Sequence, residues 1–155
     1  MPIHSPPSDT SLLLDQMLAR LEPVAAALQP PQPSIEQLTE LWHQAQKALD
    51  EGQDEAVALW SDLAERMPGQ AGAQFGLALS LQQVGQIELA GHHFSYAYAL
   101  DPSDAATAFR LGECLMALGY PNEAREALLA AQQLCALPHN PPEIGQMALQ
   151  LLQSL

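Results

Sequence analysis

Basic residues are scarce in this chain of 155 residues. Five lysines and arginines face 18 aspartates and glutamates, which gives a formal net charge of -13. Such a charge repels the phosphate backbone of nucleic acids and the surface of anionic membranes. We therefore expect no nucleic-acid partner, whereas a basic or amphipathic protein partner fits the charge. The acidity is equally consistent with a general role in solubility.

Cysteines and long apolar runs are scarce too. Cys114 and Cys135 are the only two cysteines, too few and too far apart for a zinc site, and both fall at apolar helical positions. They predict buried thiols in a reducing compartment. No run of about 18 apolar residues could cross a bilayer, and the N-terminus lacks the basic region of a secretory signal. The sequence predicts a cytoplasmic protein without membrane insertion.

Aromatic residues make up only 5% of the chain, while hydrophobic residues as a whole make up 48%. Alanine and leucine dominate this apolar fraction. These residues lose little side-chain freedom in a helix, so the composition favours helices over strands. The sequence predicts an all-α protein, and its length suits one domain.

The central part of the chain repeats itself with a period of 34 residues. The recurring pairs are Gly85 and Gly119, Ala90 and Ala124, Ala97 and Ala131, and Leu100 and Leu134. Small and apolar residues at this period are typical of the tetratricopeptide repeat (TPR), two antiparallel helices closed by a small residue. A further unit precedes these two, with one residue fewer between Gly52 and Ala56. We expect three TPR repeats over 34–137, stacked as a helical solenoid.

Apolar spacing and turn residues divide each repeat into two helices. Ser34 and Gln37 form a capping box before the first helix, and Pro121 suits a first helical turn. Asn140 and Glu143 form a second capping box before a final helix. The expected helices run from Ile35 to near Gly52, from Ala56 to before Pro68, and over about 71–84, 87–100, 105–118 and 121–136, with the last after Pro138.

The segments outside the repeats are predicted from composition and apolar spacing. Residues 1–8 are expected to be a disordered lead-in, 29–33 a proline-rich linker, and 138–155 a C-terminal capping helix. The segment 9–28 carries one apolar stripe, with Pro23 expected to kink or split its helix. This stripe would either cap the first repeat or mediate self-association. The dimerisation candidates are Leu14, Met17, Leu18 and Leu21.

No catalytic or metal-binding constellation is evident. His92 and His93 are neighbours on a helix and point about 100° apart, so one helix face cannot chelate an ion through both. His43 has only Glu40 within one helical turn, a common pairing on helices. The glycines at 52, 85 and 119 are explained by turns rather than by a phosphate loop. We expect no enzyme activity, metal or cofactor.

The first helix of each TPR lines the concave face of the stack, and repeat positions 2, 5, 9 and 12 point into it. An apolar groove of this kind suits an extended peptide with apolar anchors. It does not suit an acidic C-terminus, for which Arg110 is the one cation available. The candidate groove residues are Trp42, His43, Gln46, Leu49, Phe75, Leu79, Gln82, Phe109, Arg110, Glu113 and Met116. An adaptor that joins folded proteins through the convex face or the ends of the stack is the alternative.

The second and third repeats also resemble one family in detail. Their text reads FGLALSLQQVGQIELAGHHFSYAYALDP and FRLGECLMALGYPNEAREALLAAQQL. The shared features are the glycine turn, Ser95 with Tyr96, the run from Glu113 to Leu115, and Glu123 with Ala124. In these features the chain resembles the class II chaperones of bacterial type III secretion, the LcrH/SycD type. The resemblance is good over about 35–137. For the first 34 residues it extends only to the general layout of the segments.

The resemblance implies a cytoplasmic, non-enzymatic virulence chaperone that is often dimeric through its N-terminal region. It implies that two hydrophobic, pore-forming translocators are held before secretion, each through an extended segment in the concave groove. Carried over by position, the pocket residues would be Trp42, Leu49, Phe75, Leu79, Phe109 and Met116. Tryptophan at 42 in place of the usual tyrosine, the short first turn and the proline-rich linker depart from the family pattern.

Overall fold

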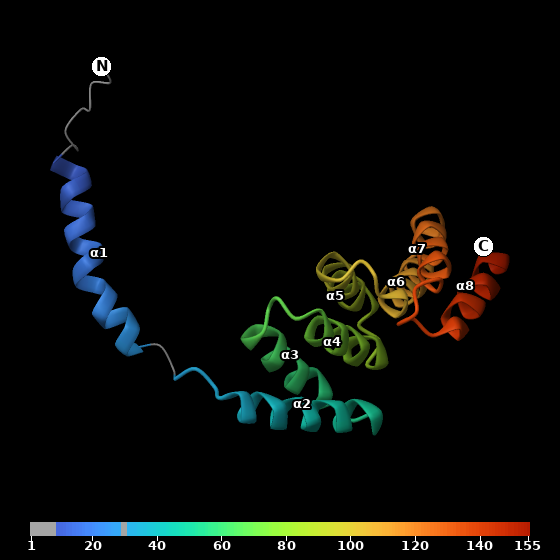
Figure 1. The fold of residues 1–155 in the computed structure, drawn as a ribbon, viewed down its shortest axis with the longest axis horizontal. Coiled ribbons are helices and arrows are strands. Elements are labelled where there is room, and N and C mark those ends of the chain that lie inside the picture. The colour runs from blue at the N-terminus through green and yellow to red at the C-terminus, as the bar shows by residue number, and fades with distance from the viewer. Residues whose placement is uncertain (1–8, 29–30) are drawn as a thin grey trace, which may run out of the picture. The chain divides into compact units, whose positions relative to one another are not determined.

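The computed structural model describes residues 9–28 and 31–155, which form eight α-helices and no strand (Figure 1). The chain divides into an N-terminal unit that ends at Ser34 and a second unit over Ile35–Leu155. The all-α prediction is confirmed. The predicted lead-in over 1–8 and part of the predicted linker over 29–33 lie outside the described residues.

The N-terminal unit contains one helix, α1 (Asp9–Leu28), with Pro23 inside it. Of the two effects expected of Pro23, the split does not occur, and the kink stays a prediction. Proline removes one backbone hydrogen bond from a helix interior, but the alanine-rich segment that follows has a high helix propensity and continues the helix. The large apolar side chains of α1 are exposed along its length.

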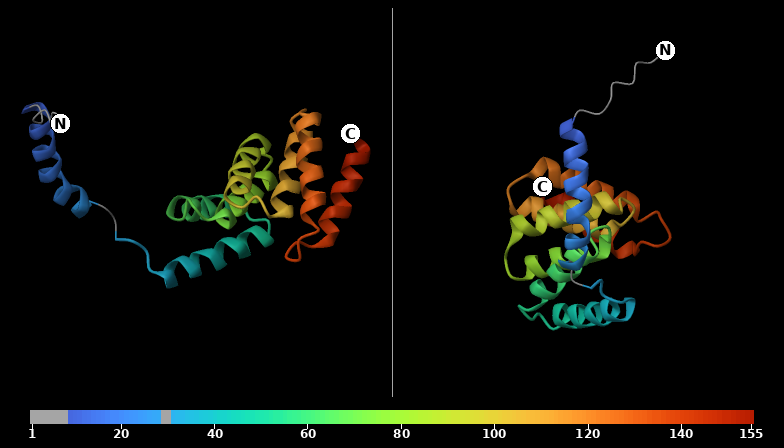
Figure 2. Two further views of the ribbon diagram at one scale, coloured as in Figure 1. Left: turned by 45° about the horizontal axis from the view of Figure 1, so that its top comes forward. Right: turned by 90° about the vertical axis from the view of Figure 1, so that its left-hand side faces the viewer.

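The second unit contains three helix pairs and a final helix. The pairs are α2 (Ile35–Asp50) with α3 (Ala56–Arg66), α4 (Ala71–Gln83) with α5 (Ile87–Leu100), and α6 (Ala105–Ala117) with α7 (Pro121–Leu134), and α8 (Pro142–Ser154) follows. Each helix packs against the next in sequence, and α2 also contacts α4 (Figure 2, left). The successive pairs thus form a solenoid in which every repeat touches only its neighbours.

The turn inside each pair depends on a glycine in the left-handed region. Gly52, Gly85 and Gly119 have φ angles of 67°, 81° and 82°. In all three turns the N–H after the glycine donates to a carbonyl five residues earlier, at 2.8–2.9 Å, which is the Schellman pattern. The first repeat is one residue shorter than the others, and the shortening lies between this turn and the start of α3. There the Ala56 N–H donates to Gln53, three residues back, whereas its counterparts reach four residues back.

Small residues let the paired helices approach closely. A Cβ added to Gly112 on α6 would come within 2.7 Å of the Leu128 side chain on α7. In the first two repeats the same position is held by Ala45 and Ala78, both fully buried. Larger residues at these positions would separate the helices, so the small-residue rule of the repeat has a direct steric cause.

The last helix is attached by a buried side chain. Asn140 is only 6% exposed. Its carbonyl oxygen accepts from the Ala105 N–H at 3.1 Å, and its amide donates to the carbonyls of Ser103 and Leu134 at 2.8 and 2.9 Å. The expected capping box is therefore wrong. The Asn140 side chain bonds to the backbone at the start of α6 and the end of α7, and α8 begins after Pro141 without a side-chain cap.

The two cysteines differ in burial. Cys114 lies in the core, where burial raises its pKa to about 11, with a further contribution from the charge of Glu113. Cys135 is only half-buried, contrary to the expectation, and its Sγ lies 3.4 Å from the Pro141 carbonyl oxygen.

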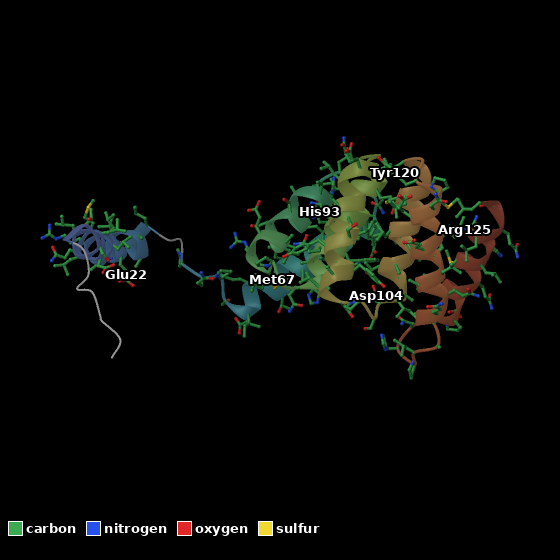
Figure 3. The ribbon with its side chains drawn as sticks, turned by 90° about the horizontal axis from the view of Figure 1, so that it is seen from above. Glu22, Met67, His93, Asp104, Tyr120 and Arg125 are labelled. Carbon is green, nitrogen blue, oxygen red and sulfur yellow. The ribbon has the colours of Figure 1, made fainter. Side chains whose placement is uncertain are left out.

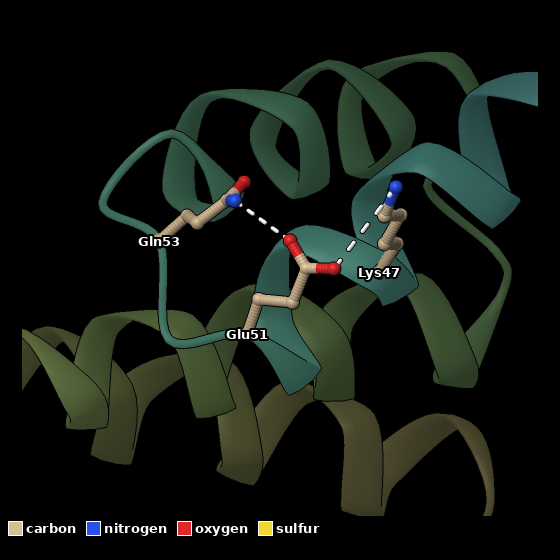
Figure 4. A network of polar contacts seen from close by, with 3 residues as sticks. All are labelled: Lys47, Glu51 and Gln53. Carbon is tan, nitrogen blue, oxygen red and sulfur yellow. Dashed lines mark hydrogen bonds and ion pairs between the residues drawn. The ribbon is translucent and has the colours of Figure 1, made fainter.

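Ion pairs contribute little to this fold. Three are present among the described residues, all within one helical turn and partly exposed. The one at the end of α2 joins Lys47 Nζ and Glu51 at 4.0 Å, and Gln53 donates to the same carboxylate at 2.7 Å (Figure 4). Exposed pairs of this type stabilise by about 0–1 kcal/mol each. The stability of the repeats therefore comes mainly from apolar packing.

Candidate functional site

The candidate groove residues occupy matching places on α2, α4 and α6. Counted back from the glycine that ends each helix, Trp42, Phe75 and Phe109 stand ten residues before it. A second row, six residues before the glycine, contains Gln46, Leu79 and Glu113. A third row, three residues before it, contains Leu49, Gln82 and Met116. The candidate side chains thus recur at fixed positions along the inner helices.

Most of these side chains are accessible in part. Those of Trp42, Phe75, Leu79 and Met116 are half-buried, so each combines a packed portion with an open one. His43 and Gln46 are exposed, and Gln82, Arg110 and Glu113 are half-buried.

Leu49 and Phe109 lie in the hydrophobic core instead. Leu49 is 5% exposed, and its end of α2 is covered where Gln83 of α4 donates to the Leu49 carbonyl at 3.3 Å. Phe109 is 4% exposed. The Arg110 guanidinium lies 6.0 Å from the Phe109 ring centroid and is held by Glu113 at 2.9 Å. Neither side chain offers an open surface to a ligand.

Trp42 joins the first two repeats. Its ring meets the buried Trp60 of α3 edge-on, with the centroids 4.8 Å apart. A Cβ added to Gly72, at the start of α4, would come within 2.9 Å of the Trp42 ring. The absence of a side chain at 72 therefore leaves space for the indole between α2 and α4.

Trp42 also forms one wall of an open apolar hollow of about 360 Å³. The sequence-based prediction did not include its other walls. Ile35 and Leu38 precede Trp42 by seven and four residues, so the helical stripe of α2 contained the signal. Met67, which Figure 3 labels, lies in the connection between α3 and α4, where no periodicity could have indicated it. The lining residues are Ile35, Leu38, Thr39, Trp42, Met67 and Gln70.

In the second repeat, Phe75 packs edge-on against the buried Phe94 of α5, with the ring centroids 5.5 Å apart. Leu79, one turn later on α4, packs partly against the same core cluster. In the third repeat, Met116 packs partly against the cluster that contains Leu128. Each partly open side chain is thus supported from behind by the core, which fixes its position.

The histidines do not form a site with other ligating groups. Among residues 9–28 and 31–155, no group of three or more His, Cys, Asp or Glu side chains could hold a metal ion. His93 on α5, labelled in Figure 3, is half-buried and its Nδ1 lies 2.9 Å from the buried Gln74 Oε1. Burial lowers the pKa of His93, and the neighbouring His92 adds to this effect.

The candidate dimerisation residues lie on α1. Leu14, Met17, Leu18 and Leu21 are between 55% and 60% exposed, which is high for large apolar side chains. None of the helices within the described part of the chain is long and apolar enough to span a membrane.

The stacked helix pairs and their glycine turns define a solenoid of the TPR type. In agreement, the family described as tetratricopeptide repeat matches residues 81–134, the second half of repeat 2 and most of repeat 3. The predicted solenoid class is confirmed.

A relative is low calcium response locus protein H of Yersinia pseudotuberculosis serotype I (strain IP32953). The two proteins are 34% identical over 73 residues. The matched segment spans 47% of this chain and 42% of that protein, less than half of its length. The chain is therefore homologous to this protein within that segment.

Solved structures of a translocator chaperone share the whole repeat fold. The type III secretion translocator chaperone SycD of Yersinia enterocolitica is 27% identical, with a TM-score of 0.74 over 79% of this chain and 85% of that one. SycD in complex with a peptide of the translocator YopD is also 27% identical, with a TM-score of 0.72 over 78% and 93% of the two chains. These similarities confirm the resemblance carried by the second and third repeats.

Proposed function

We propose that this protein is a cytoplasmic, non-enzymatic chaperone for the hydrophobic translocators of a type III secretion system. The observation that carries the proposal is the set of four apolar side chains on α2, α4 and α6 that are supported by the core and partly open. Trp42, Phe75, Leu79 and Met116 are each held by the core on one side and accessible on the other. SycD, which has the same fold, is known in complex with a peptide of YopD.

The proposed ligand is an extended segment of a translocator that carries spaced apolar side chains. Four half-buried apolar residues, spread over three inner helices, would each receive one anchor. The polar side chains beside them, His43, Gln46, Gln82 and the Arg110–Glu113 pair, would contact the backbone and polar residues of the segment. Ordering such a segment costs free energy, which keeps the complex dissociable.

The segments around the groove would have separate tasks. In this proposal the three repeats over 34–137 bind the translocator, the segment 138–155 caps the last repeat, and the helix over 9–28 forms a homodimer. For α1 the support is its exposed stripe, which lies beside a shallow hollow lined in part by Leu18 and Leu21. The net charge of -13 suits neither nucleic acid nor an anionic membrane.

The groove is tested by co-purification with a pore-forming translocator of the same secretion system. Leu79→Glu places a charge among the proposed anchors, where it would have to be desolvated on binding. Trp42→Ala removes the largest apolar surface of the set. We expect each variant to lower translocator recovery at least about tenfold, the effect of about 1.4 kcal/mol, while circular dichroism shows unchanged helicity.

The matched control is Leu89→Glu, the same substitution at an exposed position of the second repeat, on α5. It should retain the translocator. Full recovery with both Leu79→Glu and Trp42→Ala would contradict the groove. If Leu89→Glu alone lost the partner, the outer helices would carry the interaction, as the adaptor alternative requires. Phe109 is unsuitable for this test because its burial would confound binding with stability.

A further inference from the structure

A second hollow, of about 310 Å³, lies between the second and third repeats and involves none of the groove residues. Its floor is apolar and its edge contains two carboxylates from α7. Helices α5, α6 and α7 all contribute to it. The lining residues are Tyr98, Ala108, Leu111, Leu115, Glu123, Glu126, Ala127 and Ala130.

The repeat register explains why the hollow is there. One repeat earlier, 34 residues back, the positions of Ala108 and Ala127 are held by Gln74 and His93. Those two side chains, on α4 and α5, meet at 2.9 Å and so occupy the corresponding place in the second repeat.

The leucines that form the floor of the hollow are less buried than their counterparts in the second repeat. Leu77 and Leu81 of the second repeat are buried. Their counterparts in the third repeat, Leu111 and Leu115, are only half-buried. The smaller side chains at 108 and 127 thus leave the floor of the hollow open.

The charges at the edge are uncompensated. Among the described residues, neither Glu123 nor Glu126 takes part in an ion pair. The intervening Arg125 does not pair with either of them, although it lies on the same helix (Figure 3). In the second repeat the equivalent positions are Leu89 and His92, and in the first repeat they are Glu55 and Ala58, so the pair of carboxylates occurs only in the third repeat.

We propose that this hollow binds an arginine side chain from a basic segment of a protein partner. The methylene stem would pack on Ala108, Ala127 and Leu111, in the way that long cationic side chains cover apolar surface. The guanidinium would lie between Glu123 and Glu126, where its planar fork can donate to both carboxylates. The Tyr98 ring supplies a face for stacking, and the net charge of -13 attracts a basic segment from a distance.

The test uses the full chain and a small probe, acetyl-arginine-amide, followed through the backbone amide signals in a nitrogen–proton NMR titration. We expect shifts at Leu111, Ala127 and Ala130 that saturate in the millimolar range. The matched probe is acetyl-citrulline-amide, which has nearly the same shape without the charge, and it should leave these signals unchanged. Equal shifts with both probes, or shifts confined to α2 and α4, would overturn the site.

Two sets of variants separate the charges from the cavity. The double variant Glu123→Gln with Glu126→Gln should weaken arginine binding about five- to tenfold, as expected for the loss of two exposed ion pairs. The control, Glu65→Gln with Glu88→Gln, changes the net charge by the same amount and should leave arginine binding unchanged. The double variant Ala108→Gln with Ala127→His places the larger side chains of the second repeat in the hollow and should abolish arginine binding.

Unchanged binding in the carboxylate variant refutes the proposal even if the filled variant fails to fold. Trp42→Ala should bind the probe normally, which keeps this test independent of the groove.

Discussion

The indole ring of Trp60 lies directly against the backbone of Gly76. A Cβ added at position 76 would come within 2.4 Å of two ring atoms. Trp60 is fully buried and also supports Trp42 edge-on. The contact between α3 and α4 therefore positions both the core of the first repeat and one wall of the proposed groove.

Gly76→Ala is expected to destabilise the protein by about 1–3 kcal/mol, the usual cost of overpacking a core. The clash involves the middle of a rigid, buried ring rather than the end of a flexible side chain, so it cannot be relieved locally. The measurement is the free energy of unfolding from urea denaturation. Gly69→Ala is the control, because nothing lies within 4 Å of the added Cβ, and it should change stability by less than about 0.5 kcal/mol. Equal stability of the two variants would contradict the packing of Trp60.

Leu14→Glu with Leu18→Glu is expected to convert the proposed homodimer into a monomer. Both side chains are more than half exposed, so the substitutions remove no core packing. Buried in a dimer interface, the two charges would each require desolvation. Light scattering coupled to size-exclusion chromatography measures the molar mass. Gln16→Glu with Arg20→Gln changes the net charge equally and should leave the dimer intact. A double-leucine variant with the wild-type dimer mass would show that α1 does not mediate association.

Stability is expected to fall as the pH drops below the usual titration range of histidine. The pKa of His93 is lowered in the folded protein, first by burial and then by His92, so folding favours the neutral ring. The unfolded chain binds the proton more readily, with a pKa of about 6.5. The contribution of the neutral ring is thus complete above that pH and is lost below it.

The melting temperature at pH 7.5 and 5.5 measures this effect. His93→Gln removes the titrating group, so the variant should lose less stability than the wild type between the two values. His43→Gln, at an exposed position of α2, serves as the control and should follow the wild type. A pH dependence unchanged by His93→Gln would mean that other groups cause it.

The repeat architecture can be predicted from the sequence because its signals are local and recur. Gly85 and Gly119 mark turns with a left-handed backbone, which glycine adopts without steric cost. The expected helix ends differ from the observed ones by at most two residues within the second and third repeats. For the N-terminal helix the sequence predicts the bounds 9–28 but not which of the two effects expected of Pro23, a kink or a split, is avoided. The penalty of one proline is local, whereas the propensity that offsets it belongs to the residues after it.

The details of the site are harder to predict because they depend on contacts between repeats. Repeat position alone places Leu49 and Phe109 on the inner face, but Leu49 is buried in the core cluster of the first two repeats, and Phe109 in the cluster that contains Leu128 of α7 and Ala148 of α8. The role of Asn140 likewise depends on residues more than 30 positions away in sequence, on the connection before α6 and at its first residue. No periodicity encodes such partners.

The three hydrogen bonds of Asn140 also determine how the C-terminal end can open. They join the connection before α6, the end of α7 and the start of the path to α8 in one buried side chain. Fraying of α8 past Asn140 would leave the Ala105 N–H without its acceptor, which is costly for a buried group. The Ser103 and Leu134 carbonyls would each lose one donor and keep a second, His139 and the Leu137 N–H. We therefore expect the third repeat and the last helix to open together as one cooperative unit, with amide protons that exchange at a common rate rather than fraying from the terminus.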